Sequence, residues 1–256
     1  MENDNVKYED YWVAYFDILG FKNLIDKNYV SNVKNKYDKA VKAAELARWA
    51  VHSKWFSDTF LLYARNDTEV SLDKIVCAVQ LFFRRMFMEW IPMRGCLNVG
   101  EFYVNEDEDN DIFFGPALNE AYELAEKQSL IGLVFTKRAE NDLKLFKIQR
   151  TKSRKVFENQ YYAYGVPCKS GRILNLTVYD LSYDGRHNTK NKEVEDLWDS
   201  LIRMEKRAKK FHDFCNESVI AKYENTKNFL FEVYPVLKKN IEDKNSYFPK
   251  HSARNA

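Results

Sequence analysis

The segment that most restricts the fold is the run YWVAYFDI at residues 11–18. It has the length of a strand, is rich in aromatic and β-branched residues, and holds one charged residue, Asp17, near its end. Such a short apolar run, followed by Leu19-Gly20, predicts a buried β-strand. An acid placed among aromatic residues is costly to bury unless a cation or hydrogen-bond donors accompany it.

The remaining elements predict an α+β fold with helices packed on a mostly antiparallel sheet. Further strands are predicted at 93–104, 132–136 and 173–179, with a hairpin at 54–63 that turns at Ser57-Asp58. Helices are predicted at 33–51, 71–90 and 116–127, and in two segments between 194 and 240 that break near Cys215-Asn216. The acidic run 106–111 is predicted to be a solvated loop, and 182–192 a mobile link.

Composition excludes several classes of protein. The 256 residues include 40 Lys and Arg and 38 Asp and Glu, so the net charge of +2 argues against a dedicated nucleic-acid binder. No apolar run is long enough to span a membrane, and the first ten residues do not resemble a secretory signal. The four cysteines lack zinc-site spacing, and Cys77 and Cys96 are expected to be buried. A reducing, cytoplasmic location is the simplest expectation.

Two acids stand out by their placement, Asp17 at the end of the first strand and Asp58 in the hairpin turn. If the two elements are neighbours in the sheet, both carboxylates meet at one rim. Hard oxygen ligands at one rim suit Mg²⁺ or Mn²⁺, and two such ions can activate a hydroxyl and stabilise a leaving phosphate. The alternative is that each acid only caps a turn.

Four blocks, in order and at similar spacing, resemble the class III nucleotidyl cyclases over about residues 11–138. The blocks are FDILGF at 16–21, KWFSDTF at 54–60, RGCLNVGE at 94–101 and FGPALNEAYEL at 114–124. Within that family the chain is most similar to the pyrimidine (uridylate and cytidylate) cyclases of the bacterial Pycsar antiphage system.

The resemblance implies a fold and a reaction. The expected fold is a ferredoxin-like class III cyclase core at residues 8–180, followed by a C-terminal helical extension at 181–256. The expected reaction converts UTP or CTP to cUMP or cCMP plus pyrophosphate with two divalent cations, Mg²⁺ or Mn²⁺. The resemblance also implies a homodimer with shared active sites and a functional link to a cyclic-nucleotide-activated effector in antiphage defence, and the balanced charge predicts no nucleic-acid partner.

Roles for particular residues follow from the same resemblance. Asp17 and Asp58 are the expected metal ligands, helped by the backbone carbonyl of Ile18, and Asn119 is expected to reach the site from the other subunit. Lys54 is expected to read the base. Phe56, two residues later, should lie on the same side of the strand, where a bulky ring could shrink the pocket to one ring. Trp55 and Trp49 are equally available for that role, and the alternative for each is core packing. The other substrate-binding candidates are Gly20, Phe21, Arg94 and Asp111.

One position departs from the family pattern. Glu123 stands where the family helix carries an arginine that stabilises charge in the transition state. Arg94, Lys137 or Arg138 are candidates to replace it. The departure leaves two possibilities, a divergent subfamily or a slow or inactive enzyme. The alternative functions are a purine (ATP or GTP) cyclase of the same fold, and a catalytically inactive nucleotide-binding dimer module.

Overall fold

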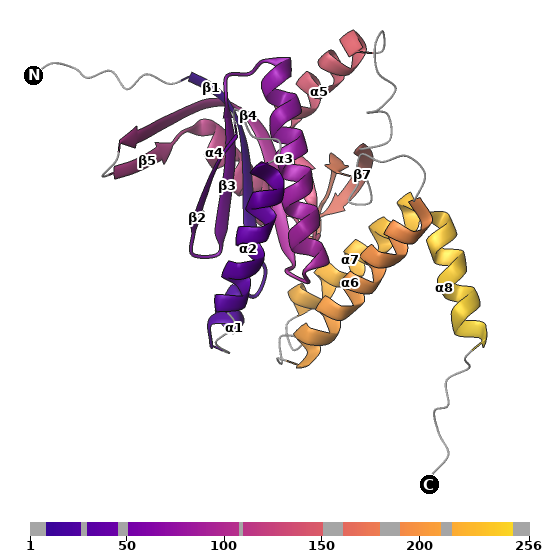
Figure 1. The fold of residues 1–256 in the computed structure, drawn as a ribbon. Helices are drawn as coiled ribbons and strands as arrows, with labels where there is room; N and C mark the ends of the chain where they lie inside the picture. The colour runs from indigo at the N-terminus through magenta and orange to yellow at the C-terminus, as the bar shows by residue number, and fades with distance from the viewer. Residues whose placement is uncertain are drawn as a thin grey trace, which may run out of the picture.

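The computed structural model describes residues 9–26, 30–45, 51–107, 110–150, 161–179, 190–210 and 217–247 (Figure 1). An eight-stranded sheet lies at its centre, in the order β2-β3-β1-β4-β6-β8-β7, with β5 paired to β4. The strands are β1 (Glu9–Ile18), β2 (Val51–Phe56), β3 (Thr59–Arg65), β4 (Met93–Asp107), β5 (Asn110–Phe114), β6 (Leu133–Phe135), β7 (Tyr161–Pro167) and β8 (Ile173–Tyr179). Every pair is antiparallel except β4 with β6.

Eight helices accompany these strands in the described ranges. They are α1 (Phe21–Asp26), α2 (Val30–Glu45), α3 (Glu69–Met88), α4 (Pro116–Lys127), α5 (Lys137–Arg150), α6 (Lys190–Lys210), α7 (Glu217–Val233) and α8 (Pro235–Tyr247). The first four strands follow a β-α-β-β-α-β course and lie in the order β2-β3-β1-β4, which is ferredoxin-like topology. The predicted α+β class is therefore confirmed.

Strand β1 separates two layers of core because its side chains alternate between the faces of the sheet. On one face, Phe16 lies 5.3 and 5.9 Å from the ring centres of Phe82 and Phe83 on α3. On the other face, a second buried cluster consists of Tyr11, Val13, Leu61, Tyr63, Phe102 and Ala117. Asp17 is an odd-numbered residue of β1, like Tyr11 and Val13, so its side chain lies on this second face, which α4 covers.

Several element boundaries differ from the prediction. Helix α2 spans Val30–Glu45 rather than 33–51, with Val51 already in β2, and α6 begins at Lys190 inside the predicted link.

Two further differences have a clear cause. Helix α3 begins at Glu69 rather than Ser71, because the Thr68 side chain accepts a hydrogen bond from the Ser71 amide and caps the helix. The described residues of the acidic run 106–111 form strand pairs instead of the predicted loop. Glu106 pairs with Asp111, and Asp107 with Asn110, so these residues extend β4 and β5.

Cys96 is buried as expected, but Cys77 is exposed. It lies on α3 between Val76 and Ala78, both of which face the core. One position on a helix turns the side chain by about 100°. The prediction that Cys77 is buried was therefore wrong, although both of its sequence neighbours are buried.

The C-terminal helices share the main hydrophobic core with the sheet. Leu197, Leu201 and Met204 of α6 and Phe229 of α7 are buried in the same cluster as β1 and α3. The predicted break between two helical segments falls at 211–216, outside the described residues, and most of the predicted link, 182–189, does so too. A third helix, α8, follows. None of the described helices is both long and apolar enough to cross a membrane.

Candidate functional site

Asp17 and Asp58 meet at one end of the sheet, the lower end in Figure 1, where β1 finishes beside the β2–β3 turn. Asp17 pairs with Thr59, and the carbonyl of Asp58 accepts a hydrogen bond from the Ile18 amide at 2.9 Å. The Asp58 carboxyl group is close enough to Asp17 to raise the pKa of Asp17. Two acids separated by 41 positions in the sequence (58 minus 17) therefore form one polar cluster.

The turn that presents Asp58 needs an unusual backbone conformation. Ser57 has φ of 55°, in the left-handed region that glycine adopts most easily. The Trp55 indole donates a hydrogen bond to the Ser57 carbonyl at 2.6 Å. The ring of Trp55 in turn packs on Tyr37 of α2, with ring centres 4.8 Å apart. The turn is thus fixed from the face of the sheet that α2 covers.

Arg94, at the start of β4, is the cationic partner of Asp17. Its Nε and Nη2 atoms lie 2.9 and 2.7 Å from Oδ2 of Asp17, and both residues are buried. Arg94 also forms an ion pair with the Glu126 carboxylate and donates from Nη1 to the Glu126 carbonyl at 3.4 Å. The buried charge of Asp17 is therefore partly neutralised.

The balance of these contacts still raises the pKa of Asp17. Burial is the largest cause, Arg94 opposes it, and the neighbouring Asp58 carboxylate adds to the increase. Loss of hydration thus outweighs the attraction of Arg94 for the ionised form of Asp17. A bound cation would favour the ionised form.

Lys169 and Lys222 also contribute charge near Asp17. The Lys169 amine lies 2.9 Å from the Glu126 carboxylate, and burial and then Arg94 lower its pKa. Burial is also the main cause that lowers the pKa of Lys222 to about 8, followed by the charges of Arg94 and Lys169, while Asp17 opposes the shift. The sequence prediction missed both lysines, because nothing in their neighbourhood distinguishes them from solvated lysines.

The predicted base-reading residues lie on the same face of the sheet as Asp17. Lys54 pairs with Leu61, and Phe56 with Thr59, on edge strand β2. Phe56 is 48% exposed, and its ring centre lies 5.8 Å from that of Phe113 on β5.

The other predicted residues lie in two places, Gly20 and Phe21 directly after β1, and Asp111 on β5, whose partner Glu106 is twelve residues (106 minus 94) along β4 from Arg94. Gly20 turns the chain after β1 with φ of 74°, and Phe21 begins α1 with a buried side chain. Asp111 lies opposite Glu106 in β5, and its side chain is outside the described part.

Helix α4 places Asn119 and Glu123 on its exposed side. Glu123 forms an ion pair with Lys127 at 3.0 Å. Arg138 pairs with Asp10 at the other end of β1. Of the candidates to replace the family arginine, only Arg94 therefore contacts Asp17 within one chain.

The donor set fits a divalent cation that also binds substrate. No described group of three or more His, Cys, Asp or Glu side chains forms a closed metal cage. Mg²⁺ is commonly held by one or two carboxylates together with substrate phosphates rather than by a complete protein cage. Asp17 and Asp58 provide such a pair of carboxylates.

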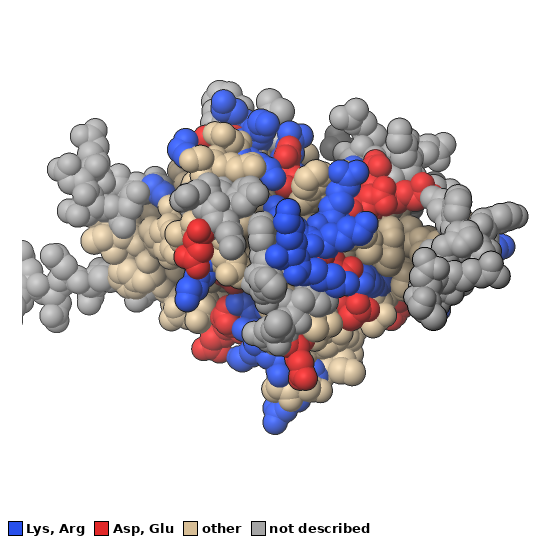
Figure 2. Space-filling model, turned by 90° about the horizontal axis from the view of Figure 1, so that it is seen from below, with Lys and Arg blue, Asp and Glu red and all other residues tan. Residues whose placement is uncertain are grey.

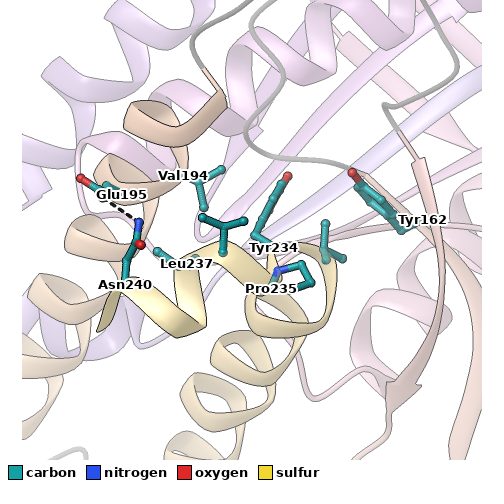
Figure 3. A pocket seen from close by; sticks show the side chains of 9 residues that line it. Tyr162, Val194, Glu195, Tyr234, Pro235, Leu237 and Asn240 are labelled. Carbon is teal, nitrogen blue, oxygen red and sulfur yellow. Dashed lines mark hydrogen bonds between the residues drawn. The ribbon is translucent and has the colours of Figure 1, made fainter. Parts of the chain in front are cut away.

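A separate pocket of about 230 Å³ lies between β7 and the C-terminal helices (Figure 3). Tyr162 of β7 lines one side, and Glu195 accepts a hydrogen bond from Asn240 at 3.5 Å on the other. None of the residues of the Asp17 cluster lines it. The pocket is therefore not the site at the sheet end.

No protein-family profile and no curated protein sequence matches this chain. Among solved structures, it is similar to the adenylyl cyclase CyaB from P. aeruginosa, with a TM-score of 0.49 and 14% identity over 70% of this chain and 98% of that one. Adenylate cyclases from Trypanosoma brucei give a TM-score of 0.48 and 10% identity over 70% and 92%. A dimeric guanylyl cyclase domain from the fungus Blastocladiella emersonii gives 0.45 and 16% over 54% and 85%. These likenesses are distant, so the chemistry of the site must follow from its own side chains.

Proposed function

We propose that this protein is a nucleotide cyclase that converts UTP or CTP to the 3′,5′-cyclic monophosphate and pyrophosphate. The observation behind the proposal is the convergence of Asp17 and Asp58 at the end of β1, with Arg94 against Asp17. The ferredoxin-like order of the first four strands and the four sequence blocks that resemble class III cyclases support it.

In this reaction the ribose 3′ oxygen forms a bond to the α-phosphorus while the bond to the bridging oxygen breaks. Pyrophosphate leaves, and the hydroxyl proton is released. Asp17 and Asp58, with the Ile18 carbonyl, would hold two Mg²⁺ or Mn²⁺ ions. Bound there, these ions would supply the Lewis acidity that neutralises charge on the phosphates. Arg94 holds the Asp17 carboxylate in place, so the protein contributes mainly positioning and electrostatic stabilisation.

We assign the selection of a pyrimidine base to two residues of the edge strand β2. Phe56 lies on the Asp17 face and beside Phe113, where a bulky ring narrows the space available to a base. Lys54 lies two residues earlier on the same face, where its amine can donate to a base carbonyl. Asp111, Gly20 and Phe21 complete the proposed substrate contacts.

The proposal includes a homodimer in which Asn119 acts on the nucleotide held by the partner subunit. Asn119 is exposed on α4, and Tyr122 of the same helix is 48% exposed beside Tyr15. Exposed aromatic residues on one face are typical of association surfaces. The proposed biological role, synthesis of a second messenger that activates an effector in antiphage defence, is supported by the sequence resemblance alone.

Glu123 motivates a second candidate, a nucleotide-binding dimer without turnover. In place of the family arginine, α4 carries an exposed Glu123–Lys127 ion pair. A glutamate cannot stabilise the negative charge that develops on the phosphates. If nothing replaces the missing cation, the loss in transition-state stabilisation is about 3 kcal/mol.

The test is to incubate the purified protein with Mn²⁺ and each of UTP, CTP, ATP and GTP, and to measure cyclic product and pyrophosphate. The proposal expects product from UTP or CTP and none from an Asp58→Asn variant. Asp67→Asn is the matched control, because Asp67 lies beyond the other end of β3 and is exposed. Product from ATP or GTP alone would support the purine cyclase. Triphosphate binding without product would support the inactive module.

A further inference from the structure

Helix α7 is fixed against the loop that follows α4. The Thr226 hydroxyl accepts a hydrogen bond from the Ile131 amide at 2.9 Å and donates to the Lys222 carbonyl at 2.7 Å. Asn225 donates from its side-chain amide to the Ser129 carbonyl at 2.7 Å. Residues at i and i+4 lie on the same face of a helix, so these contacts hold Lys222 on the side that faces the sheet.

The loop under α7 is itself joined to the Asp17 cluster. The Lys169 amide donates to the Lys127 carbonyl at 2.9 Å, which brings the β7–β8 turn to the end of α4. Glu126, one residue earlier, pairs with both Lys169 and Arg94. Arg94 pairs with Asp17, so the carboxylates of Glu126 and Asp17 already have cationic partners.

Lys222 adds a third cation without adding a carboxylate. It is half-buried, and it forms no ion pair within 4 Å with any carboxylate in the described part of the chain. The charged groups close enough to affect it are Arg94 of β4, Lys169 of the β7–β8 turn and Asp17 of β1. The cluster holds as many carboxylates, namely Asp17, Asp58 and Glu126, as cations, but none of the three lies within ion-pair distance of the half-buried Lys222 amine. An unpaired, half-buried ammonium group beside Arg94 and Lys169 favours an anionic ligand as its partner.

We propose that Lys222 binds the polyphosphate of the nucleotide, so that helix α7 of the C-terminal extension forms part of the substrate site. The inference rests on the proposed function, because a nucleoside triphosphate is the polyanion that this site would receive. The ligand class is a linear chain of phosphates, either free or attached to a nucleoside. Figure 2 views the molecule from the sheet end that holds Asp17 and Asp58, and Lys and Arg side chains gather near the middle of that face.

The test compares the binding of inorganic tripolyphosphate and of UMP by calorimetry at pH 7 in Mg²⁺. Lys222→Gln should weaken tripolyphosphate binding about tenfold or more, since a charged hydrogen bond to phosphate is lost. UMP binding should change less than twofold, because UMP lacks the two terminal phosphates. Lys222→Arg should keep tripolyphosphate affinity within about threefold of the parent protein. Lys239→Gln, the same change at an exposed position of α8, should leave both affinities unaltered.

Each other result contradicts the inference in a recognisable way. If Lys222→Gln binds tripolyphosphate as the parent does while the parent cyclises UTP or CTP, the inference is wrong and the proposed function stands. If Lys222→Gln loses as much affinity for UMP as for tripolyphosphate, Lys222 supports the structure of the site and does not bind the terminal phosphates. If the parent protein neither binds tripolyphosphate nor cyclises any triphosphate, both proposals fail together.

Discussion

Arg94 directs two nitrogens at one oxygen of Asp17, with Nε and Nη2 at 2.9 and 2.7 Å from Oδ2. Both residues are more than nine-tenths buried. A buried ion pair of this kind contributes little net stability, yet removing one partner leaves a charge without compensation. The pair therefore fixes the orientation of the carboxylate more than it strengthens the fold.

Arg94→Met should lower the free energy of unfolding by about 3–5 kcal/mol, because Asp17 and Glu126 would both lose their buried partner. Denaturant unfolding measures the change. The double variant Arg94→Met with Asp17→Asn should recover part of the loss, since it removes the uncompensated carboxylate. Equal stability of Arg94→Met and the parent would show that Arg94 does not hold Asp17 in solution.

Mn²⁺ with a nucleoside triphosphate should raise the melting temperature. A ligand at 100 times its Kd stabilises the folded state by about 2.7 kcal/mol, which is readily measured by thermal shift. The increase should disappear in Asp58→Asn and persist in Asp67→Asn. An Asp58→Asn variant that gains as much as the parent would remove Asp58 from the metal site.

Lys222→Met should stabilise the ligand-free protein at pH 7. Burial lowers the pKa of Lys222 to about 8, so below that pH the folded protein carries the buried charge and its free energy of unfolding is lowered by the full cost of burying it. Between pH 8 and the usual lysine range, the unfolded chain binds more protons than the folded protein. The free energy of unfolding of the parent therefore increases as pH rises through this range. Melting temperatures of the two proteins should therefore converge above pH 8. A constant difference would indicate a packing effect instead.

Two inactive variants should restore activity when mixed if the sites are shared between subunits. Asp58→Asn and Asn119→Ala each impair one half of every site in their own homodimers. In mixed dimers one of the two sites is intact, so a one-to-one mixture should recover about one quarter of the parent activity. Recovery near zero after subunit exchange would place Asn119 and Asp58 in the same chain.

Phe56→Ala should relax the choice of base. The widened space beside Phe113 should raise turnover of ATP or GTP relative to UTP and CTP. Phe56→Leu keeps more of the side-chain volume and should stay closer to the parent. The ratios of kcat/KM for the four triphosphates provide the measurement, and unchanged ratios would exclude Phe56 from base selection.

The sequence was most informative where a pattern was strong and local. The strand ending in Asp17, the turn at Asp58 and the helix from Pro116 each combine an apolar pattern with a clear boundary. Helix α5 was missed because its apolar residues do not recur on one face, and β7 because Gly165 and Pro167 weaken its strand pattern. Strand β6 was found, but its parallel pairing with β4 depends on long-range contacts.

The cationic part of the site was harder to predict. Lys169 lies in a turn, and Lys222 lies in a helix with several other charged residues, so each has the local signature of a solvated lysine. Their approach to Arg94 depends on how α7 and the β7–β8 turn dock against α4. Such docking is a tertiary property that neither periodicity nor residue spacing contains.

The hydrogen bond from Ile131 to Thr226 has a consequence for biosynthesis. The amide of Ile131 is buried, and its acceptor is supplied by a residue 95 positions later. Domains begin to fold from the N-terminal side while the ribosome is still adding residues. The sheet of a nascent chain would therefore keep an unsatisfied donor at this loop until α7 emerges, and its final packing would wait until Thr226 has left the ribosome.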